Sequence, residues 1–232
     1  MSLENVIIDV IIPAYNEEDS IDSVINEIPK DLVREIIVCN NASTDRTKEI
    51  ALKAGANVQD QPNKGYGNAC LKGMEYIAGK KIAPDIVVFL DGDYSDFPEE
   101  MPLLIDPIIT SDYDLVIGSR SKGNLENGSM MPQQIFGNWL ATTLIKLIYK
   151  YDFSDLGPFR AIRYDKLLAI EMEDKDFGWT VEMQVKAAKH GFKCTEVPVT
   201  YRKRIGVSKV SGTIKGTILA GHKILWTIFK LI

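Results

Sequence analysis

The feature that most constrains the fold of this chain is the alternation of apolar runs and amphipathic stretches along its first half. Four apolar runs have the length of strands: VIIDVII (6–12), EIIVCN (35–40), DIVVFLD (85–91) and DLVIG (114–118). Helical segments are expected between them at about 21–28, 44–54 and 99–109. Strands that are apolar along their whole length and alternate with helices are typical of a mostly parallel sheet covered on both faces. We therefore predict an α/β fold.

The second half of the chain is less regular. A helix is expected over about 132–149 and another over 179–190. The segment 192–201 is typical of an edge strand, because Pro198 cannot donate an amide hydrogen to a neighbouring strand. We find no internal repeat and no linker long enough to separate two domains.

The composition is that of an ordinary globular protein, with 45% hydrophobic and 25% charged residues. Cys39, Cys70 and Cys194 are odd in number and far apart, so we expect no disulfide framework and a reducing compartment. The first residues lack the pattern of a signal peptide, and no 18-residue stretch is both apolar throughout and free of charge. Secretion and a membrane-spanning helix are therefore not expected.

Charge is distributed unevenly along the chain. The net charge is −5, yet the segment 197–232 has seven Lys or Arg and no acid, so the first 196 residues carry −12. A basic end of this kind indicates contact with something anionic, and a solvated basic face is the alternative. We expect no nucleic-acid partner.

Polar clusters follow three of the predicted strands, at PAYNEED (13–19), NNASTD (40–45) and DGDYSD (91–96). In parallel sheets ligands collect beyond the carboxyl ends of the strands, so these clusters predict a binding site. The first cluster has three acids and no glycine, whereas a dinucleotide or P-loop fold places glycines there to hold phosphate on a helix N-terminus. A base or ribose that offers N–H and O–H donors suits this turn better than a diphosphate does.

Asp91-Gly92-Asp93 places two carboxylates at the end of a buried strand. Alone, the two carboxylates would raise each other's pKa because their negative charges repel. A hard divalent cation such as Mg²⁺ or Mn²⁺ removes this repulsion. Such a cation also bridges to a diphosphate. Asp-Gly is common in turns, so the pair is informative only together with the other two clusters.

The motifs IIPAYNEEDSI, VCNNASTDRT, NKGYGNA and FLDGDYSDFPEE, in this order, resemble the nucleotide-sugar half of a family 2 glycosyltransferase with the GT-A (Rossmann-like) fold. The segments IGSR, DLGPFRAIR, GWTVEMQVKAAKHGFKCTEVPVTYR and RIGVSKVSG resemble the branch that contains dolichyl-phosphate mannose and glucose synthases. The resemblance implies a GT-A domain over 1–212, with a nucleotide-sugar half at about 1–120 and an acceptor half at about 121–212. It also implies inverting, metal-dependent transfer of a hexose from a UDP- or GDP-sugar to a polyprenyl-phosphate-type acceptor.

The resemblance also implies roles for individual residues. The base and ribose pocket would be formed by Pro13, Tyr15, Glu17, Asp45, Lys64, Gly65 and Gly67. Asp91 would contact the ribose or the metal, and Asp93 would hold the metal on the diphosphate. Arg204, Ser208 and Lys209 would close over the donor diphosphate or the acceptor phosphate.

The acceptor side leaves alternatives open. A phosphate acceptor needs cations and no general base, and Arg120 is a candidate cation. A hydroxyl acceptor needs a base, for which Asp155 and Glu182 are candidates, although Asp155 would serve equally to orient the sugar. Arg160 is either a phosphate ligand or a buried arginine paired with an acid.

Two departures bear on the acceptor. The polyprenyl-phosphate synthases often carry a glutamine where this chain has Ser95, and an arginine where it reads Met130-Met131-Pro132-Gln133. One phosphate-binding cation is therefore missing or comes from elsewhere. A sugar could stack on Phe177 or Trp179, although aromatic residues more often pack in a core.

The end of the chain predicts an amphipathic helix over 213–232. Its apolar half contains Ile214, Ile218, Ile224, Leu225, Ile228, Phe229, Leu231 and Ile232, and its other half contains Lys215, Lys223, Trp226 and Lys230. This pattern is typical of a helix that lies in a membrane interface, which would place the protein on the inner face of the cell membrane. The alternative is packing on its own domain or on a second copy in a homodimer.

Three other functions remain open: a soluble family 2 enzyme with a hydroxyl acceptor, a sugar-nucleotide-binding module without turnover, and a nucleotidyltransferase. The last needs a glycine-rich first loop for a triphosphate, which PAYNEED is not.

Overall fold

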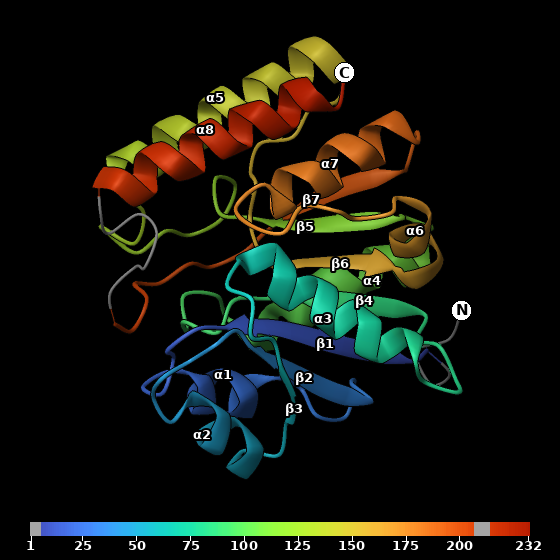
Figure 1. The fold of residues 1–232 in the computed structure, drawn as a ribbon. Coiled ribbons are helices and arrows are strands. Elements are labelled where there is room, and N and C mark those ends of the chain that lie inside the picture. The colour runs from blue at the N-terminus through green and yellow to red at the C-terminus, as the bar shows by residue number, and fades with distance from the viewer. Residues whose placement is uncertain (1–5, 207–213) are drawn as a thin grey trace.

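The structure, a computed structural model that describes residues 6–206 and 214–232, is organised around one seven-stranded sheet (Figure 1). The strands are β1 (Ile8–Ala14), β2 (Glu35–Asn40), β3 (Asn57–Asp60), β4 (Ile86–Phe89), β5 (Leu115–Ser119), β6 (Arg160–Arg163) and β7 (Cys194–Pro198). Their order in the sheet is β3-β2-β1-β4-β6-β5-β7. All neighbouring pairs are parallel except those of β6, which runs antiparallel between β4 and β5. The predicted α/β fold with a mostly parallel sheet is confirmed.

The predicted strands are all present, and β7 lies at an edge with Pro198 as its last residue. Strands β3 and β6 were not predicted. Each has four residues, and neither NVQD nor RAIR is an apolar run. These two strands form because they pair with β2, β4 and β5, and the local sequence does not predict such pairing.

Helices cover both faces of the sheet. They are α1 (Ile21–Glu27), α2 (Thr47–Lys53), α3 (Tyr66–Ala78), α4 (Met101–Ser111), α5 (Pro132–Tyr149), α6 (Tyr164–Ala169), α7 (Trp179–Lys189) and α8 (Ile214–Lys230). Along β1, Ile11 packs into a cluster with α3, α5 and α7, whereas Val10 and Ile12 pack into a second cluster with α1 and α4. Because both faces are buried, every residue of β1 is apolar except Asp9, which pairs with Arg34 and Lys80.

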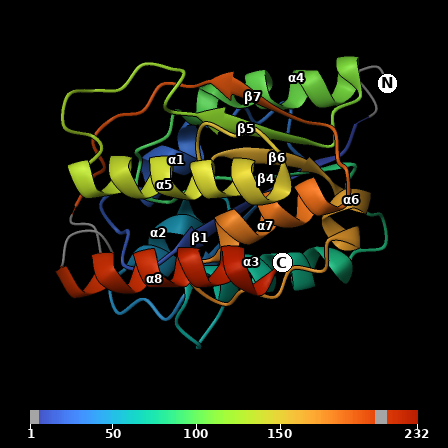
Figure 2. The ribbon, with the colours of Figure 1, turned by 90° about the horizontal axis from the view of Figure 1, so that it is seen from above.

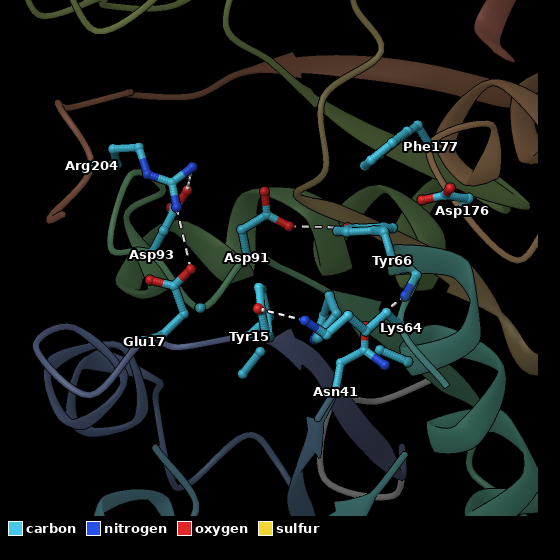
Figure 3. Close-up of a pocket in the computed structure, with 15 residues that line it drawn as sticks. Tyr15, Glu17, Asn41, Lys64, Tyr66, Asp91, Asp93, Asp176, Phe177 and Arg204 are labelled. Carbon is cyan, nitrogen blue, oxygen red and sulfur yellow. Dashed lines mark hydrogen bonds and ion pairs between the residues drawn. The ribbon is translucent and has the colours of Figure 1, made fainter. Parts of the chain in front are cut away.

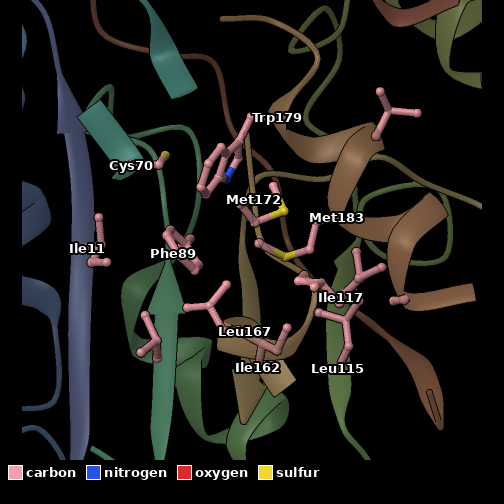
Figure 4. Packing of buried hydrophobic residues seen from close by; sticks show 14 of the residues in the cluster. Ile11, Cys70, Phe89, Leu115, Ile117, Ile162, Leu167, Met172, Trp179 and Met183 are labelled. Carbon is pink, nitrogen blue, oxygen red and sulfur yellow. The ribbon is translucent and has the colours of Figure 1, made fainter. Parts of the chain in front are cut away.

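The first of these clusters forms the larger part of the core. Figure 4 shows Ile11, Phe89 and Ile162 from the sheet beneath Trp179 and Met183 of α7. Trp179 is 1% exposed and its ring centroid lies 6.0 Å from that of Phe89, so it is a core residue rather than a sugar platform.

Helices α5 and α8 lie side by side on the outside of this layer (Figures 1 and 2). Helix α8 packs on α5 and α7, with Thr227 and Ile228 buried and the Tyr149 hydroxyl donating to the carbonyl of Ile228. The predicted C-terminal helix is therefore confirmed, and one side of it covers the domain. The proposed boundary at 212 lies outside the described residues.

Candidate active site

A cavity of about 380 Å³ lies beyond the carboxyl ends of β1, β2 and β4, where the three polar clusters were expected to meet (Figure 3). The loop after β1 contributes Tyr15 and Glu17, the loop after β2 contributes Asn41, and the loop after β4 contributes Asp91 and Asp93. The start of α3 and the loop before α7 close the opposite side.

One end of the cavity suits a planar, uncharged group. The Lys64 ammonium donates to the Tyr15 hydroxyl at 2.7 Å and lies 4.5 Å from the centroid of the Tyr15 ring. The Asn41 side chain accepts from the Gly65 amide at 2.8 Å, which fixes the start of α3. These contacts hold an aromatic ring and a cation in the wall of the cavity.

The glycines beside Tyr66 permit close backbone packing. Gly65 has φ +137°, and a Cβ there would lie 2.1 Å from the carbonyl oxygen of Lys175. A Cβ on Gly67 would lie 1.9 Å from the carbonyl oxygen of Asp174. Gly65 lines the cavity as expected, whereas Gly67 does not line it and packs on the loop before α7.

Asp91 and Asp93 lie together in the wall of the cavity. The Tyr66 hydroxyl donates to Asp91 at 3.0 Å, and Ser95 donates to one oxygen of Asp93 through its amide at 3.0 Å and its hydroxyl at 2.5 Å. Burial, followed by the charge of Asp93, raises the pKa of Asp91 to about 7. A divalent cation would relieve both causes, so the two carboxylates fit a hard metal ion.

A second cavity, of about 310 Å³, meets the first at these acids. It shares Asp91, Asp93 and Arg204 with the first cavity and adds Arg120 and Tyr201. Its outer walls are α5, α8 and Met130 before α5; the two helices contribute Gln133, Gln134, Gly137, Asn138, Ala220, Gly221 and Ile224. Among the described lining residues, Arg120 and Arg204 are the cations.

Arg120 is held rigidly by Asp155. Its Nε and Nη2 donate to the two carboxylate oxygens at 2.9 and 2.7 Å, and its backbone amide donates to Asp155 at 2.7 Å. Asp155 is fully buried, and its own amide donates to Glu196. The guanidinium also lies 5.1 Å from the centroid of the Tyr201 ring. Because both oxygens of Asp155 accept from Arg120, the geometry fits an orienting role better than that of a base.

Comparison with known proteins identifies the family. Residues 9–169 match the family model "Glycosyl transferase family 2". The chain belongs to this family. It is 33% identical over 196 residues to glycosyltransferase AglJ of Haloferax volcanii, covering 84% of this chain and 63% of AglJ. It is also 33% identical to the undecaprenyl-phosphate mannosyltransferase of Micrococcus luteus, covering 89% and 88% of the two chains.

A solved structure agrees on the fold. The glucosyl-3-phosphoglycerate synthase of Mycobacterium tuberculosis, in complex with Mn²⁺, UDP and phosphoglyceric acid, superposes with a TM-score of 0.78 over 98% of this chain and 79% of that one. The identity is 22%, so this likeness supports the GT-A fold alone. The chain is a family 2 glycosyltransferase with that fold, as the sequence motifs predicted.

Most of the expected donor-side residues of this family 2 glycosyltransferase line the first cavity: Pro13, Tyr15, Glu17, Lys64, Gly65, Asp91 and Asp93. Asp45 does not. Its carboxylate accepts from the amide and hydroxyl of Thr47 and from the amide of Glu18, so it braces the loop instead of facing the cavity. Ser208 and Lys209 lie outside the described residues.

Glu182 was expected to face the site, and this expectation was wrong. Its buried carboxylate accepts from the amides of Glu173 and Asp174 and pairs with Lys186 at 2.9 Å, and it lines neither cavity. The acid side chain caps the backbone of the loop that precedes α7. This position does not suit a base for an acceptor hydroxyl.

Arg160 is structural, but it forms no ion pair with an acid in the part of the chain that the structure describes. It is fully buried, and its guanidinium donates to the carbonyl oxygens of Leu156, Gly157 and Thr180. Carbonyl oxygens carry only partial charge, and burial, the largest influence, lowers the pKa of Arg160 to about 10.

Three polar residues in or near the cavities were not predicted from the sequence. Tyr66 lines both cavities, Asn41 lines the first, and Asp96 is buried in the loop after β4 without lining either. Tyr66 lies between the two glycines of the motif NKGYGNA, so its position in this motif was a signal for a role in the site. Asp96 is 2% exposed, and neither of its carboxylate oxygens has a hydrogen-bond partner among the described residues. Burial, followed by the charges of Asp91 and Asp93, raises its pKa well above the usual range. No local signal distinguishes Asp96 from the exposed Glu99.

Proposed function

We propose that this family 2 glycosyltransferase uses Mg²⁺ or Mn²⁺ to move a hexose from a UDP- or GDP-sugar to a polyprenyl-phosphate-type acceptor, with inversion at the anomeric carbon. The observation that carries the proposal is the junction of two cavities at Asp91 and Asp93, one suited to a nucleotide and the other lined by Arg120 and Arg204. The names of two relatives, the mannosyltransferase above and a dolichyl-phosphate hexose transferase of Haloferax volcanii, support it.

On the donor side, Tyr15 and Lys64 would bind the base and ribose, and Asp91 and Asp93 would hold the cation against the diphosphate. The cation would offset the charge that develops on the nucleoside diphosphate as it leaves. Tyr66 and Ser95 hold the two carboxylates in place, so the carboxylates themselves need little reorganisation when the donor binds.

On the acceptor side, a phosphate monoester explains the chemistry with the fewest groups. It is largely ionised near neutrality and needs no base, only cations that position it. Arg120, fixed by Asp155, supplies such a cation at the cavity junction. A hydroxyl acceptor would need a base, and neither Asp155, engaged by Arg120, nor Glu182, outside both cavities, is placed to be one.

The outer surface of α5 and α8 supports a lipid acceptor. Of the 15 exposed large hydrophobic residues among those described, ten lie on or beside these helices: Met131, Ile135, Phe136, Trp139, Leu147, Ile218, Leu219, Trp226, Phe229 and Ile232. Neither helix contains an acid, and the lysines Lys146, Lys223 and Lys230 each pair with an acid of a neighbouring segment. A large apolar surface suits a membrane interface, and residues of the same two helices line the second cavity, where we place the acceptor.

We therefore propose a peripheral position on the inner face of the cell membrane, with 1–212 as the catalytic domain and 213–232 as a docking helix. None of the helices within residues 6–206 and 214–232 has the length and hydropathy needed to span a bilayer. A homodimer through α8 is the competing occupant of this surface, and sedimentation in the absence of lipid distinguishes the two.

The test is transfer from labelled UDP- and GDP-sugars to polyprenyl phosphate in liposomes, with Mn²⁺ or with EDTA. We expect a lipid-linked product with one donor and none after chelation. Product formed on a small hydroxylated acceptor and none on polyprenyl phosphate would contradict the proposed acceptor. Product that persists in EDTA would contradict the metal.

A further inference from the structure

Arg204 bridges two carboxylates that belong to different loops of the donor cavity. Its Nη1 lies 3.0 Å from Oδ2 of Asp93, and its Nη2 lies 3.2 Å from Oε1 of Glu17 (Figure 3). The Asp93 and Glu17 side chains are 8% and 10% exposed, so one guanidinium neutralises two largely buried acids.

This guanidinium uses the oxygen that a metal ion would need. The other oxygen of Asp93 already accepts from the amide and the hydroxyl of Ser95, so Oδ2 is the oxygen that faces Arg204. A divalent cation bound at Oδ2 and a guanidinium at the same atom would repel each other strongly in a partly buried site. Binding of the metal at Oδ2 therefore favours displacement of Arg204 from Asp93.

The contacts around Arg204 allow this movement without unfolding the loop. The backbone of 202–205 is tied to the loop after β4, because Arg202 N donates to the Ser95 carbonyl at 2.9 Å and Ile205 N to the Asp93 carbonyl at 3.0 Å. The Arg204 side chain itself is 28% exposed, and its buried Nε has no hydrogen-bond partner among the described residues. A phosphate at the cavity junction would give the guanidinium the acceptors that it lacks.

We propose that Arg204 is an exchangeable counter-ion: it occupies Asp93 while the donor is absent and moves to the donor diphosphate when the metal binds. The inference rests on the proposed function, because it takes Asp91 and Asp93 as the metal site. Its consequence is energetic coupling. The metal alone must displace Arg204 from Asp93 and leaves it Glu17 as its carboxylate partner, whereas the metal with a nucleoside diphosphate gives Arg204 a new anionic partner. Metal and donor therefore bind with positive cooperativity, and each raises the affinity of the other by the same factor.

The experiment measures Mn²⁺ binding by electron paramagnetic resonance, with and without UDP or GDP, in the wild-type chain and in Arg204→Ala. We expect Arg204→Ala to bind Mn²⁺ alone about fivefold or more tightly than the wild type does. The factor by which the nucleotide increases the affinity for Mn²⁺ should be about fivefold or more smaller in the variant than in the wild type. If the substitution removed only a contact with phosphate, the nucleotide would have a smaller effect on Mn²⁺ affinity, but the binding of Mn²⁺ alone would not become tighter. Unchanged or weaker binding of Mn²⁺ alone would overturn the proposal.

Two further variants separate this effect from general charge and from misfolding. Lys203→Ala removes the same charge from the adjacent residue, whose ammonium lies 3.9 Å from Glu126, and should change neither affinity beyond about twofold. Arg204→Gln, neutral and of similar length, should repeat the result of Arg204→Ala if the alanine variant is unstable.

If the wild type binds no Mn²⁺ even with nucleotide, or Asp93→Ala binds it equally well, the proposed metal site itself is wrong. If the metal site holds and only the rise in Arg204→Ala is absent, the counter-ion role alone is wrong.

Discussion

The two cavities of this glycosyltransferase are built in different ways. The first cavity, where we propose that the donor binds, is formed mainly by short loops that directly follow β1, β2 and β4, and its polar side chains are fixed by neighbours such as Ser95 for Asp93. The second, which we propose as the acceptor cavity, is formed by groups far apart in the chain, with Arg120 held by Asp155 and stacked near Tyr201. Its outer walls are two helices whose exposed sides are apolar. The proposed donor site therefore depends on local loop chemistry, whereas the proposed acceptor site depends on tertiary packing.

The largest effect is expected at the junction of the cavities. Asp93→Ala removes a carboxylate required by both the metal and Arg204, so transfer should fall by about a thousandfold. Mn²⁺-dependent binding of UDP or GDP, followed by calorimetry, should be lost as well. Ser95→Ala is the matched control, because the Ser95 amide still donates to Asp93, and it should retain most of the binding. Full activity of Asp93→Ala would remove the basis for treating the two cavities as one site.

The next effect should separate the cavities. Arg120→Lys keeps the charge but loses the two-pronged contact with Asp155, so kcat/KM for the lipid acceptor should fall by about a hundredfold. The dissociation constant for the nucleotide should stay within about twofold, as measured by calorimetry with Mn²⁺. If kcat/KM for the lipid acceptor and the affinity for the nucleotide fell by the same factor, the two cavities would not act separately.

A smaller effect is expected on the outer surface. Phe136 and Trp139 are 60% and 58% exposed and line neither cavity. Changing both to serine should weaken binding to anionic vesicles by about tenfold or more, since each aromatic side chain gains about 1.5–3 kcal/mol when it is buried. Flotation assays measure this loss. Leu52→Ser, which changes an exposed leucine on α2, is the control, and nucleotide binding should be unchanged in both variants. Undiminished vesicle binding would favour the homodimer at this surface.

The smallest effect concerns pH and the donor cavity alone. The pKa of Asp91 in the metal-free protein is raised to about 7, so at lower pH a proton competes with the metal. The affinity for Mn²⁺ should rise by about eightfold between about pH 6 and pH 7.5, and Asp91→Asn should remove this dependence.

The same shift has a consequence for the stability of the metal-free chain. The folded state holds the Asp91 proton more tightly than the unfolded state does, so this group stabilises the fold at low pH. Its contribution to the free energy of unfolding should decline as the pH rises from about 4 to about 7. Chemical denaturation in EDTA, compared with Asp91→Asn, measures the trend, and an opposite slope would contradict the assigned pKa.

Much of the fold and the donor site could be predicted because local patterns carry them. Apolar runs predicted β1, β2, β4 and β5, and the polar clusters after three of them do meet in one cavity. Asp45 was misplaced because a capping carboxylate and a ligand-binding carboxylate look alike in sequence. Glu182 was misplaced because helical spacing gives the face of a helix but not the neighbour which that face meets.

The sequence alone determined the family, every strand except β3 and β6, and the order of the donor motifs, because strand pattern and loop chemistry involve residues close together in the chain. Only the tertiary structure decided that Asp155 holds Arg120, that Glu182 supports a loop, and that Arg204 bridges Asp93 and Glu17. Arg120 and Asp155 are 35 residues apart in the chain, and Glu17 and Arg204 are 187 apart. The contacts of Glu182 depend on the direction in which α7 presents this side chain. Such contacts form only when the sheet and its covering helices are packed, and no local pattern encodes them.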